Sequence, residues 1–161
     1  MKKLISAAEA AGMVKDGMTV MIGGFLGNGS PHAIIDALVE SGVKDLTLIV
    51  NDTAYPDKGC GRLIAGKQVR KVIVSHIGTN PCTSEQMNSG ELEIEFCPQG
   101  TLAERVRSGG ARYRSHQIER MRKGKCHVET SILYSEILTD YERIGDHAFN
   151  IAQALDKLDE N

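Results

Sequence analysis

The sequence predicts an α/β fold, in which helices cover a layered, open and mostly parallel sheet and an α-helical hairpin follows as a tail. Two patterns lead to this prediction. Short apolar runs alternate with amphipathic stretches up to about residue 110, whereas no β-like run follows residue 115. The composition, with 41% hydrophobic and 25% charged residues, is typical of a globular protein and argues against a disordered chain.

The elements follow one another in regular alternation. The predicted strands are short apolar runs bounded by turn-forming residues, at positions 18–22, 46–50, 69–75 and 92–96. Helical spacing of apolar residues predicts helices near the N-terminus and at residues 31–41, 79–89 and 101–107, with a short helix or loop at 58–67. The last of these helices is expected to end at Gly109-Gly110. Such alternation predicts parallel strands joined by right-handed crossovers.

The tail has a different pattern. Its apolar residues recur every three or four positions and form one helical stripe: Ile137, Tyr141, Ile144, Ala148, Ile151 and Leu155. An earlier helix ending at Gly124 would complete a hairpin. Because two helices bury too little surface to form a stable domain alone, the tail needs a partner. We therefore divide the chain into a domain of residues 1–111 and a tail of residues 112–161.

Composition excludes several classes of function. Aromatic residues are scarce, at 4%, and the net charge is −2, so nucleic-acid binding is not expected. No apolar run is long enough to span a bilayer, and the amphipathic N-terminus lacks a signal-peptide core, so we expect no membrane partner and a cytoplasmic location. The four cysteines are scattered without a CxxC pair, which favours free thiols over disulfides or zinc ligands.

The richest motif is a glycine-dense loop between the first strand and the next helix, with sequence GGFLGNGSP at residues 23–31. Glycines permit positive φ angles and a close approach of a ligand to the backbone. The spacing fits neither GxGxxG nor a phosphate-binding P-loop. A ligand-facing loop and a purely structural tight turn are both open at this point. The candidate substrate-binding residues are Gly23, Gly24, Phe25, Gly27 and Gly29.

This loop carries a family resemblance. The stretch from Asp16 to Pro31 resembles the α-subunit signature of family I CoA-transferases, of the acetate/acetoacetate and 3-oxoacid type. Residues 41–53, 70–81, 89–96 and 98–111 are similar to successive blocks of that family in the same order. The resemblance implies a truncated CoA-transferase α-subunit fold, because the family's α subunit continues beyond residue 111 with further α/β structure.

The resemblance also implies a reaction. Family members exchange CoA between a short-chain acyl-CoA and a free carboxylate through a glutamyl-CoA intermediate. The catalytic glutamate lies in a separate β subunit, in a Ser-Glu-Asn-Gly motif that is absent from residues 1–161. The implied partners are therefore that β subunit, in a hetero-oligomer, and the two substrates. CoA is a substrate, and no permanently bound cofactor is expected.

One catalytic residue carries over from the family. The glutamine of the PQG block corresponds to Gln99, whose neutral amide donates a hydrogen bond to the oxyanion of a tetrahedral intermediate. The alternative is that Gln99 only caps a helix beginning near Thr101. Asn51 and Asn80 are further candidates for substrate binding, because ligands gather at the carboxyl ends of parallel strands. Loop-capping roles are equally open for both asparagines.

The tail has its own resemblance. Residues 116–155 look like the last helical hairpin of PhoU-like phosphate-uptake regulators, most clearly at YERIGDHAFNIA, residues 141–152. Glu142 and Asp146 share a helix face, and such pairs gather metal ions in that family. One pair is a poor metal site, so no metal is predicted. The alternative function is a non-enzymatic, PhoU-like phosphate-regulation or interaction module, or an inactive chimeric fragment.

Overall fold

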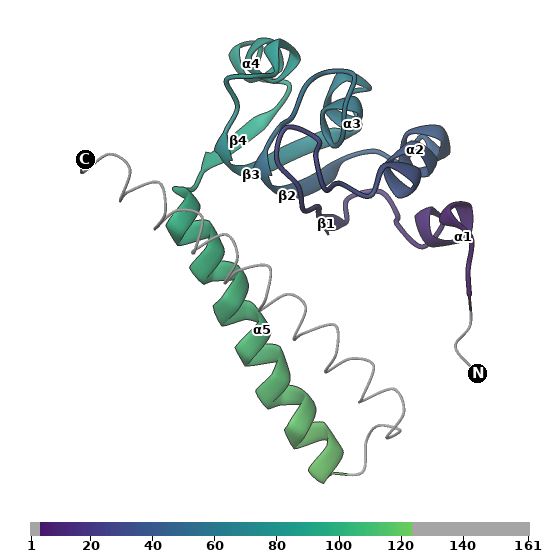
Figure 1. Ribbon diagram of the computed structural model, residues 1–161, viewed down its shortest axis with the longest axis vertical. Coiled ribbons are helices and arrows are strands. Elements are labelled where there is room, and N and C mark those ends of the chain that lie inside the picture. Colours follow the sequence, from purple (N-terminus) through teal and green to yellow (C-terminus); the bar gives the residue numbers. More distant parts are fainter. Residues whose placement is uncertain (1–3, 124–161) are drawn as a thin grey trace. The chain divides into compact units, whose positions relative to one another are not determined.

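The computed structural model describes residues 4–123 (Figure 1). The chain divides into two compact units, residues 1–97 and 98–161. The first unit has the α/β architecture that the sequence predicts. None of the helices within residues 4–123 is long and apolar enough to cross a membrane.

A four-stranded parallel sheet forms the centre of the first unit. Its strands are β1 (Thr19–Met21), β2 (Leu46–Asp52), β3 (Val69–His76) and β4 (Glu93–Phe96). They lie side by side in the order β1-β2-β3-β4, and every neighbouring pair is parallel. The prediction of parallel strands is thus confirmed. Because each strand runs parallel to its predecessor, every strand ends at the same edge as the others.

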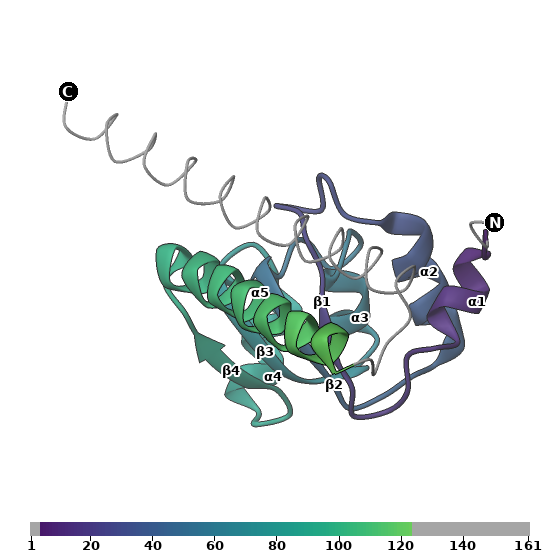
Figure 2. The same cartoon turned by 90° about the horizontal axis from the view of Figure 1, so that it is seen from below.

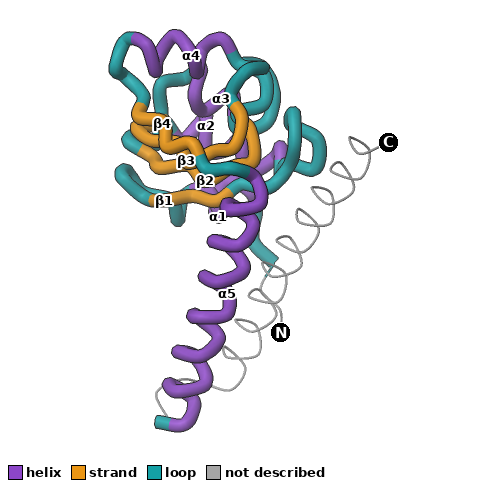
Figure 3. The backbone as a smooth tube through the Cα atoms, turned by 90° about the vertical axis from the view of Figure 1, so that its left-hand side faces the viewer, coloured by secondary structure: helices purple, strands orange, loops and turns teal. Residues whose placement is uncertain are grey.

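Helices cover one face of this sheet. They are α2 (His32–Ser41), α3 (Gly61–Ala65) and α4 (Pro81–Asn88), which all lie on the same side of the strands (Figures 1 and 3). A short helix α1 (Ala7–Ala11) lies beside α2 (Figure 2). A capping box formed by Ser6 and Glu9 starts α1, and Gly42, in the left-handed conformation with φ 67°, ends α2.

The core lies between this helical layer and the sheet. Alternate residues of β2 and β3 face the helices and are 0–3% exposed: Leu46, Leu48, Val50, Val72 and Val74. Ile35 and Leu38 of α2 and Leu63 and Ile64 of α3 pack against them, at 0–2% exposed. Each such side chain contributes about 1.5–3 kcal/mol through burial.

The second unit contains one long described helix, α5 (Gln99–Arg122). The prediction of a helix that ends at Gly109-Gly110 is wrong, because α5 continues through both glycines to Arg122. Neither glycine has a positive φ, and each costs about 1 kcal/mol relative to alanine in a helix. That penalty is small beside the hydrogen bonds of an uninterrupted helix. The apolar stripe predicted for residues 137–155 lies outside the described residues.

Candidate functional site

The glycine loop folds into a two-residue β-hairpin. Phe25 and Asn28 exchange backbone hydrogen bonds, N to O, of 3.0 and 2.9 Å. The turn residues Leu26 and Gly27 have φ angles of 52° and 80°, as a type I′ turn requires. Asparagine is preferred at the first of these positions because L residues with larger side chains are strained there. Leucine at this position is the reason that the sequence did not predict the hairpin.

Packing explains why two of the loop residues are glycine. A Cβ on Gly24, where φ is 118°, would lie 2.3 Å from Oγ of Ser30 and 2.8 Å from the backbone oxygen of Asn28. A Cβ on Gly27 would lie 3.1 Å from Cβ of Lys58. These glycines are therefore required by the hairpin itself and by its contact with residues 58–59. The exposed part of the loop is formed by Gly23, Phe25, Asn28 and Gly29.

A buried carboxylate holds the tip of the hairpin. Asp52, the last residue of β2, is only 3% exposed. Both of its carboxylate oxygens accept from the backbone nitrogen of Leu26, at 3.1 Å each, and Oδ2 also accepts from the backbone nitrogen of Ala54, at 3.1 Å. Asp52 therefore connects the loop after β1 with the loop after β2.

Asn51 gives the loop a second attachment. Its Nδ2 donates to the backbone oxygen of Gly24, at 2.9 Å, and its own backbone oxygen accepts from Oγ of Ser75 on β3, at 2.6 Å. The loop is also closed internally by Oγ of Ser30, which donates to the oxygen of Gly23 at 3.0 Å. The structure thus brings Asn51 to the glycine loop, where it supports the backbone at Gly24.

Asn80 lies deeper than its place after a strand indicates. It is 0% exposed, and its Nδ2 donates to the backbone oxygen of Thr53 at 2.9 Å. It is also the residue before α4, although its side chain makes no capping hydrogen bond there. Oγ1 of the neighbouring Thr79 donates to the oxygen of Ala54 at 2.8 Å. Asn80 and Thr79 therefore fix the chain after β2, and Asn80 offers no surface to a ligand.

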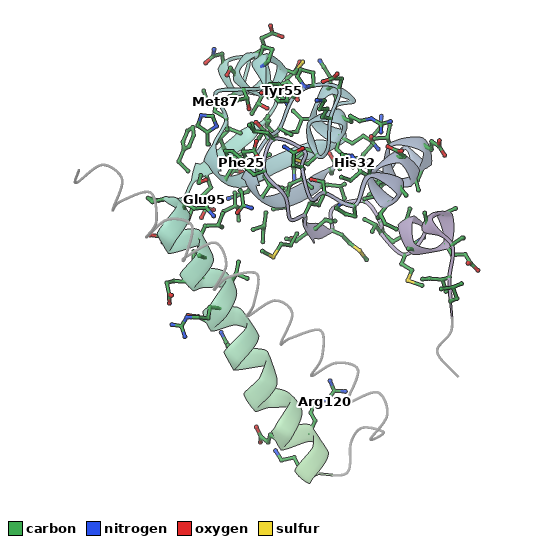
Figure 4. The ribbon with its side chains drawn as sticks, in the orientation of Figure 1. Phe25, His32, Tyr55, Met87, Glu95 and Arg120 are labelled. Carbon is green, nitrogen blue, oxygen red and sulfur yellow. The ribbon has the colours of Figure 1, made fainter. Side chains whose placement is uncertain are left out.

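Two exposed aromatic residues flank the strand ends. Phe25, in the hairpin, is 57% exposed, and Tyr55, in the loop after β2, is 38% exposed (Figure 4). Nζ of Lys58 lies 5.8 Å from the centre of the Tyr55 ring, within the range of a cation–π contact. The carboxyl edge of the sheet thus combines the exposed residues Gly23 and Gly29 with aromatic surface and the cation of Lys58.

Cys60 is a buried thiol in contact with Asp52. It is 4% exposed, and its Sγ donates to the backbone oxygen of Asp52 at 3.4 Å. Burial, and secondarily the negative charge of Asp52, raise the pKa of the Cys60 thiol to about 12. A thiol with such a pKa stays protonated at neutral pH and is not a nucleophile, so Cys60 has a structural role.

Gln99 belongs to the second unit. It is the first residue of α5 and is half-buried. Since α5 begins at Gln99, two residues before Thr101, the side chain lies in the first turn of the helix, and the catalytic and capping interpretations both stay predictions. The candidate metal pair Glu142 and Asp146 lies outside the described residues. Within residues 4–123, no cluster of three or more His, Cys, Asp or Glu is arranged to hold a metal ion.

The parallel sheet, with helices on one face and the glycine hairpin after β1, defines an α/β protein, and the carboxyl edge of its sheet is the candidate ligand site. Residues 4–116 match the family model for coenzyme A transferase, and residues 111–155 match that for the PhoU domain. The chain belongs to the coenzyme A transferase family.

Curated relatives of the family are closely similar over about two thirds of the chain. The α subunit of an acetate CoA-transferase from Escherichia coli is 57% identical over 109 residues, which are 68% of this chain and 50% of that protein. The α subunit of the acetoacetyl-CoA:acetate/butyrate CoA transferase from Clostridium acetobutylicum is 51% identical over 109 residues, with the same coverage. The chain therefore spans about half the length of the curated relatives it matches.

Solved structures share the fold. A thioester complex of an acyl-CoA transferase from Escherichia coli O157:H7 has a TM-score of 0.57 at 22% identity and covers 66% of this chain and 22% of its own. A variant of the decarboxylase AibA/AibB has a TM-score of 0.57 at 23% identity and covers 68% of this chain and 44% of its own. The second likeness shows that this fold supports more than one reaction.

Proposed function

We propose that the chain is the α-subunit component of a CoA-transferase, which exchanges CoA between a short-chain acyl-CoA and a free carboxylate. Residues 1–111 are the partial α-subunit domain, and residues 112–161 are a PhoU-like tail. The observation that carries the proposal is the family match over residues 4–116, with 57% identity to an acetate CoA-transferase α subunit. The matched residues include the whole glycine hairpin and both of its attachments, Asn51 and Asp52.

The proposed reaction needs a second chain. A glutamate of a β subunit attacks the thioester carbonyl, the CoA thiolate leaves, and an acyl-glutamyl anhydride forms. The thiolate then attacks the glutamyl carbonyl, which releases the carboxylate and leaves a glutamyl-CoA thioester; the acceptor carboxylate reverses these steps. Every step passes through a tetrahedral oxyanion, so donors placed in advance lower each barrier.

We assign the contribution of this chain to Gln99 and the glycine loop. Gln99 supplies an amide donor to the oxyanion, and its amide stays neutral throughout. The exposed residues Gly23, Phe25 and Gly29 form the wall against which the acyl-CoA lies. Asn51 acts through Gly24, whose carbonyl it binds.

The test is an assay of the reconstituted enzyme. The full chain is mixed with a β subunit of the family, and acetyl transfer from acetyl-CoA to butyrate is followed. We expect transfer by the wild-type chain and a fall in kcat of roughly 100- to 1000-fold in Gln99→Ala, the range for loss of one oxyanion donor. Asn88→Ala, which removes an exposed amide on α4, is the matched control and should retain full activity. Absence of transfer, with both chains folded and associated, would contradict the proposal.

A second function has its own support in the PhoU-domain match at residues 111–155. In this alternative, the chain is a non-enzymatic module for phosphate regulation, with the α/β unit as its scaffold. Metal analysis of the purified full chain separates the two functions. A bound metal ion that is lost in Glu142→Gln, together with no transferase activity, would favour regulation.

A further inference from the structure

Two strained backbone positions at the site share one partner. Four residues other than glycine have positive φ in the described part of the chain: Leu26, Asp45, Ala54 and Lys67. Side chains disfavour this left-handed conformation, which persists only where the surrounding structure enforces it. Leu26 and Ala54, with φ of 52° and 51°, both donate their backbone N–H to the carboxylate of Asp52.

The carboxylate that receives these bonds is itself enclosed. Asp52 is 3% exposed, and among residues 4–123 no cation forms an ion pair with it. Its charge is compensated by backbone N–H groups, which are strong donors to an ionised acceptor. A buried carboxylate without a cation is costly unless such bonds are made, so the burial of Asp52 depends on its bonds to Leu26 and Ala54.

We propose that Asp52 is a positioning residue, whose buried carboxylate holds Leu26 and Ala54 in left-handed conformations and so sets the glycine hairpin in its substrate-binding geometry. The link to substrate rests on the proposed transferase function. The hairpin tip is held at Leu26, one residue from Phe25 and two from Gly24. Without the carboxylate, Leu26 returns to an ordinary φ, the type I′ turn opens, and the exposed surface of Phe25 and Gly23 is displaced.

Hydrogen exchange of backbone amides, followed by NMR on the full chain, tests the structural half of the proposal without any enzyme assay. In the wild-type chain, the amides of Leu26 and Ala54 should exchange at least about tenfold more slowly than that of the exposed Gly29. Asp52→Ala should accelerate both amides at least about tenfold. Asp52→Asn keeps one acceptor oxygen and should have a smaller effect.

A matched control removes a carboxylate elsewhere. Asp16→Ala deletes an Oδ1 that accepts from the backbone nitrogen of Lys44 at 2.8 Å, near the opposite edge of the sheet. It should leave exchange at Leu26 within about twofold of wild type. Equal exchange at Leu26 in Asp52→Ala and Asp16→Ala would overturn the proposal. Should Asp52→Ala not fold, Asp52→Asn is compared with wild type: faster exchange at Leu26 or Ala54 supports the proposal, and unchanged exchange at both overturns it.

Rescue by glycine tests the functional half. In the reconstituted transferase, Asp52→Ala should lower kcat/KM at least about tenfold. Glycine adopts a positive φ without strain, so adding Leu26→Gly should raise kcat/KM at least about threefold above that of Asp52→Ala alone. Adding Lys67→Gly instead relieves a similar φ of 53° far from Asp52 in the chain and should restore nothing. Equal rescue by both glycines would contradict a positioning role. A wild-type chain without transferase activity would refute the proposed function, while the exchange data still decide whether Asp52 holds the hairpin.

Discussion

Replacing Gly24 by alanine should destabilise the protein far more than the same change at its neighbour, Gly23. A Cβ on Gly24 meets Oγ of Ser30 at 2.3 Å and the backbone oxygen of Asn28 at 2.8 Å. Rotating Ser30 away relieves the first contact but breaks its hydrogen bond to Gly23, worth about 1 kcal/mol. The second contact is with the backbone of the hairpin and cannot be relieved without opening it.

The φ of 118° at Gly24 adds strain of about 1–3 kcal/mol for a residue with a side chain. Together these effects should lower the free energy of unfolding by about 2–4 kcal/mol. A Cβ on Gly23 would have no atom within 4 Å, and φ there is not positive, so Gly23→Ala should change stability by less than about 0.5 kcal/mol. At Gly29, φ is 74° and the nearest atom to an added Cβ lies at 3.9 Å. Gly29→Ala should therefore lower the free energy of unfolding by about 1 kcal/mol, between the losses for Gly23→Ala and Gly24→Ala.

Urea unfolding followed by far-UV circular dichroism measures this series, because the chain has no tryptophan for fluorescence. The order of stability should be wild type and Gly23→Ala, then Gly29→Ala, then Gly24→Ala, with unchanged slopes against urea. Similar losses at Gly23 and Gly24 would refute the geometry of the hairpin, because only the contacts and φ distinguish these adjacent residues.

Three further outcomes follow from the structure. Gly61→Ala places a Cβ 2.0 Å from the backbone oxygen of Tyr55 and should lower the free energy of urea unfolding by about 3 kcal/mol or more; near-wild-type stability would contradict this contact. Gly109→Ala, inside α5 with no atom within 4 Å, should instead raise the helix content and stability by about 0.5–1 kcal/mol, and a loss would show that the helix does not pass through this glycine. Because the pKa of Cys60 is raised, its thiol stays protonated to a higher pH in the folded state than in the unfolded state. The contribution of Cys60 to the free energy of unfolding is therefore complete below about pH 9 and is lost as the pH rises toward 12. The difference in unfolding free energy between wild type and Cys60→Ala should therefore shrink over that range, and a constant difference would refute it.

The sequence predicted the sheet well because hydrophobic burial determines it. The run at residues 46–50 and the run at 69–75 match β2 and β3, since alternate residues such as Leu48 and Val72 face the helices. The end of the helix at Gly109-Gly110 was predicted wrongly, because adjacent glycines weaken a helix without excluding it. The helix continues through the two glycines because helical residues precede and follow them in α5.

The site was predicted less completely, since its geometry depends on contacts between distant segments. The roles of the glycine loop and of Asn51 in substrate binding stay predictions, and the structure adds that Asn51 binds the backbone of Gly24. Asn80 follows a strand in the sequence as Asn51 does, and nothing local indicates that it is fully buried. The role of Asp52 was missed, although an acidic residue at the end of an apolar strand is a signal that could have indicated it.

The matches to the two families meet within helix α5. The match to coenzyme A transferases ends at residue 116 and the match to the PhoU domain begins at residue 111, both within Gln99–Arg122. Each residue added or deleted inside a helix turns the helical residues after it by about 100° and shifts them by about 1.5 Å relative to those before it. A join in a flexible loop would tolerate such changes. The two matches share residues 111–116, so an insertion or deletion there would change the rotational phase between the two ends of α5.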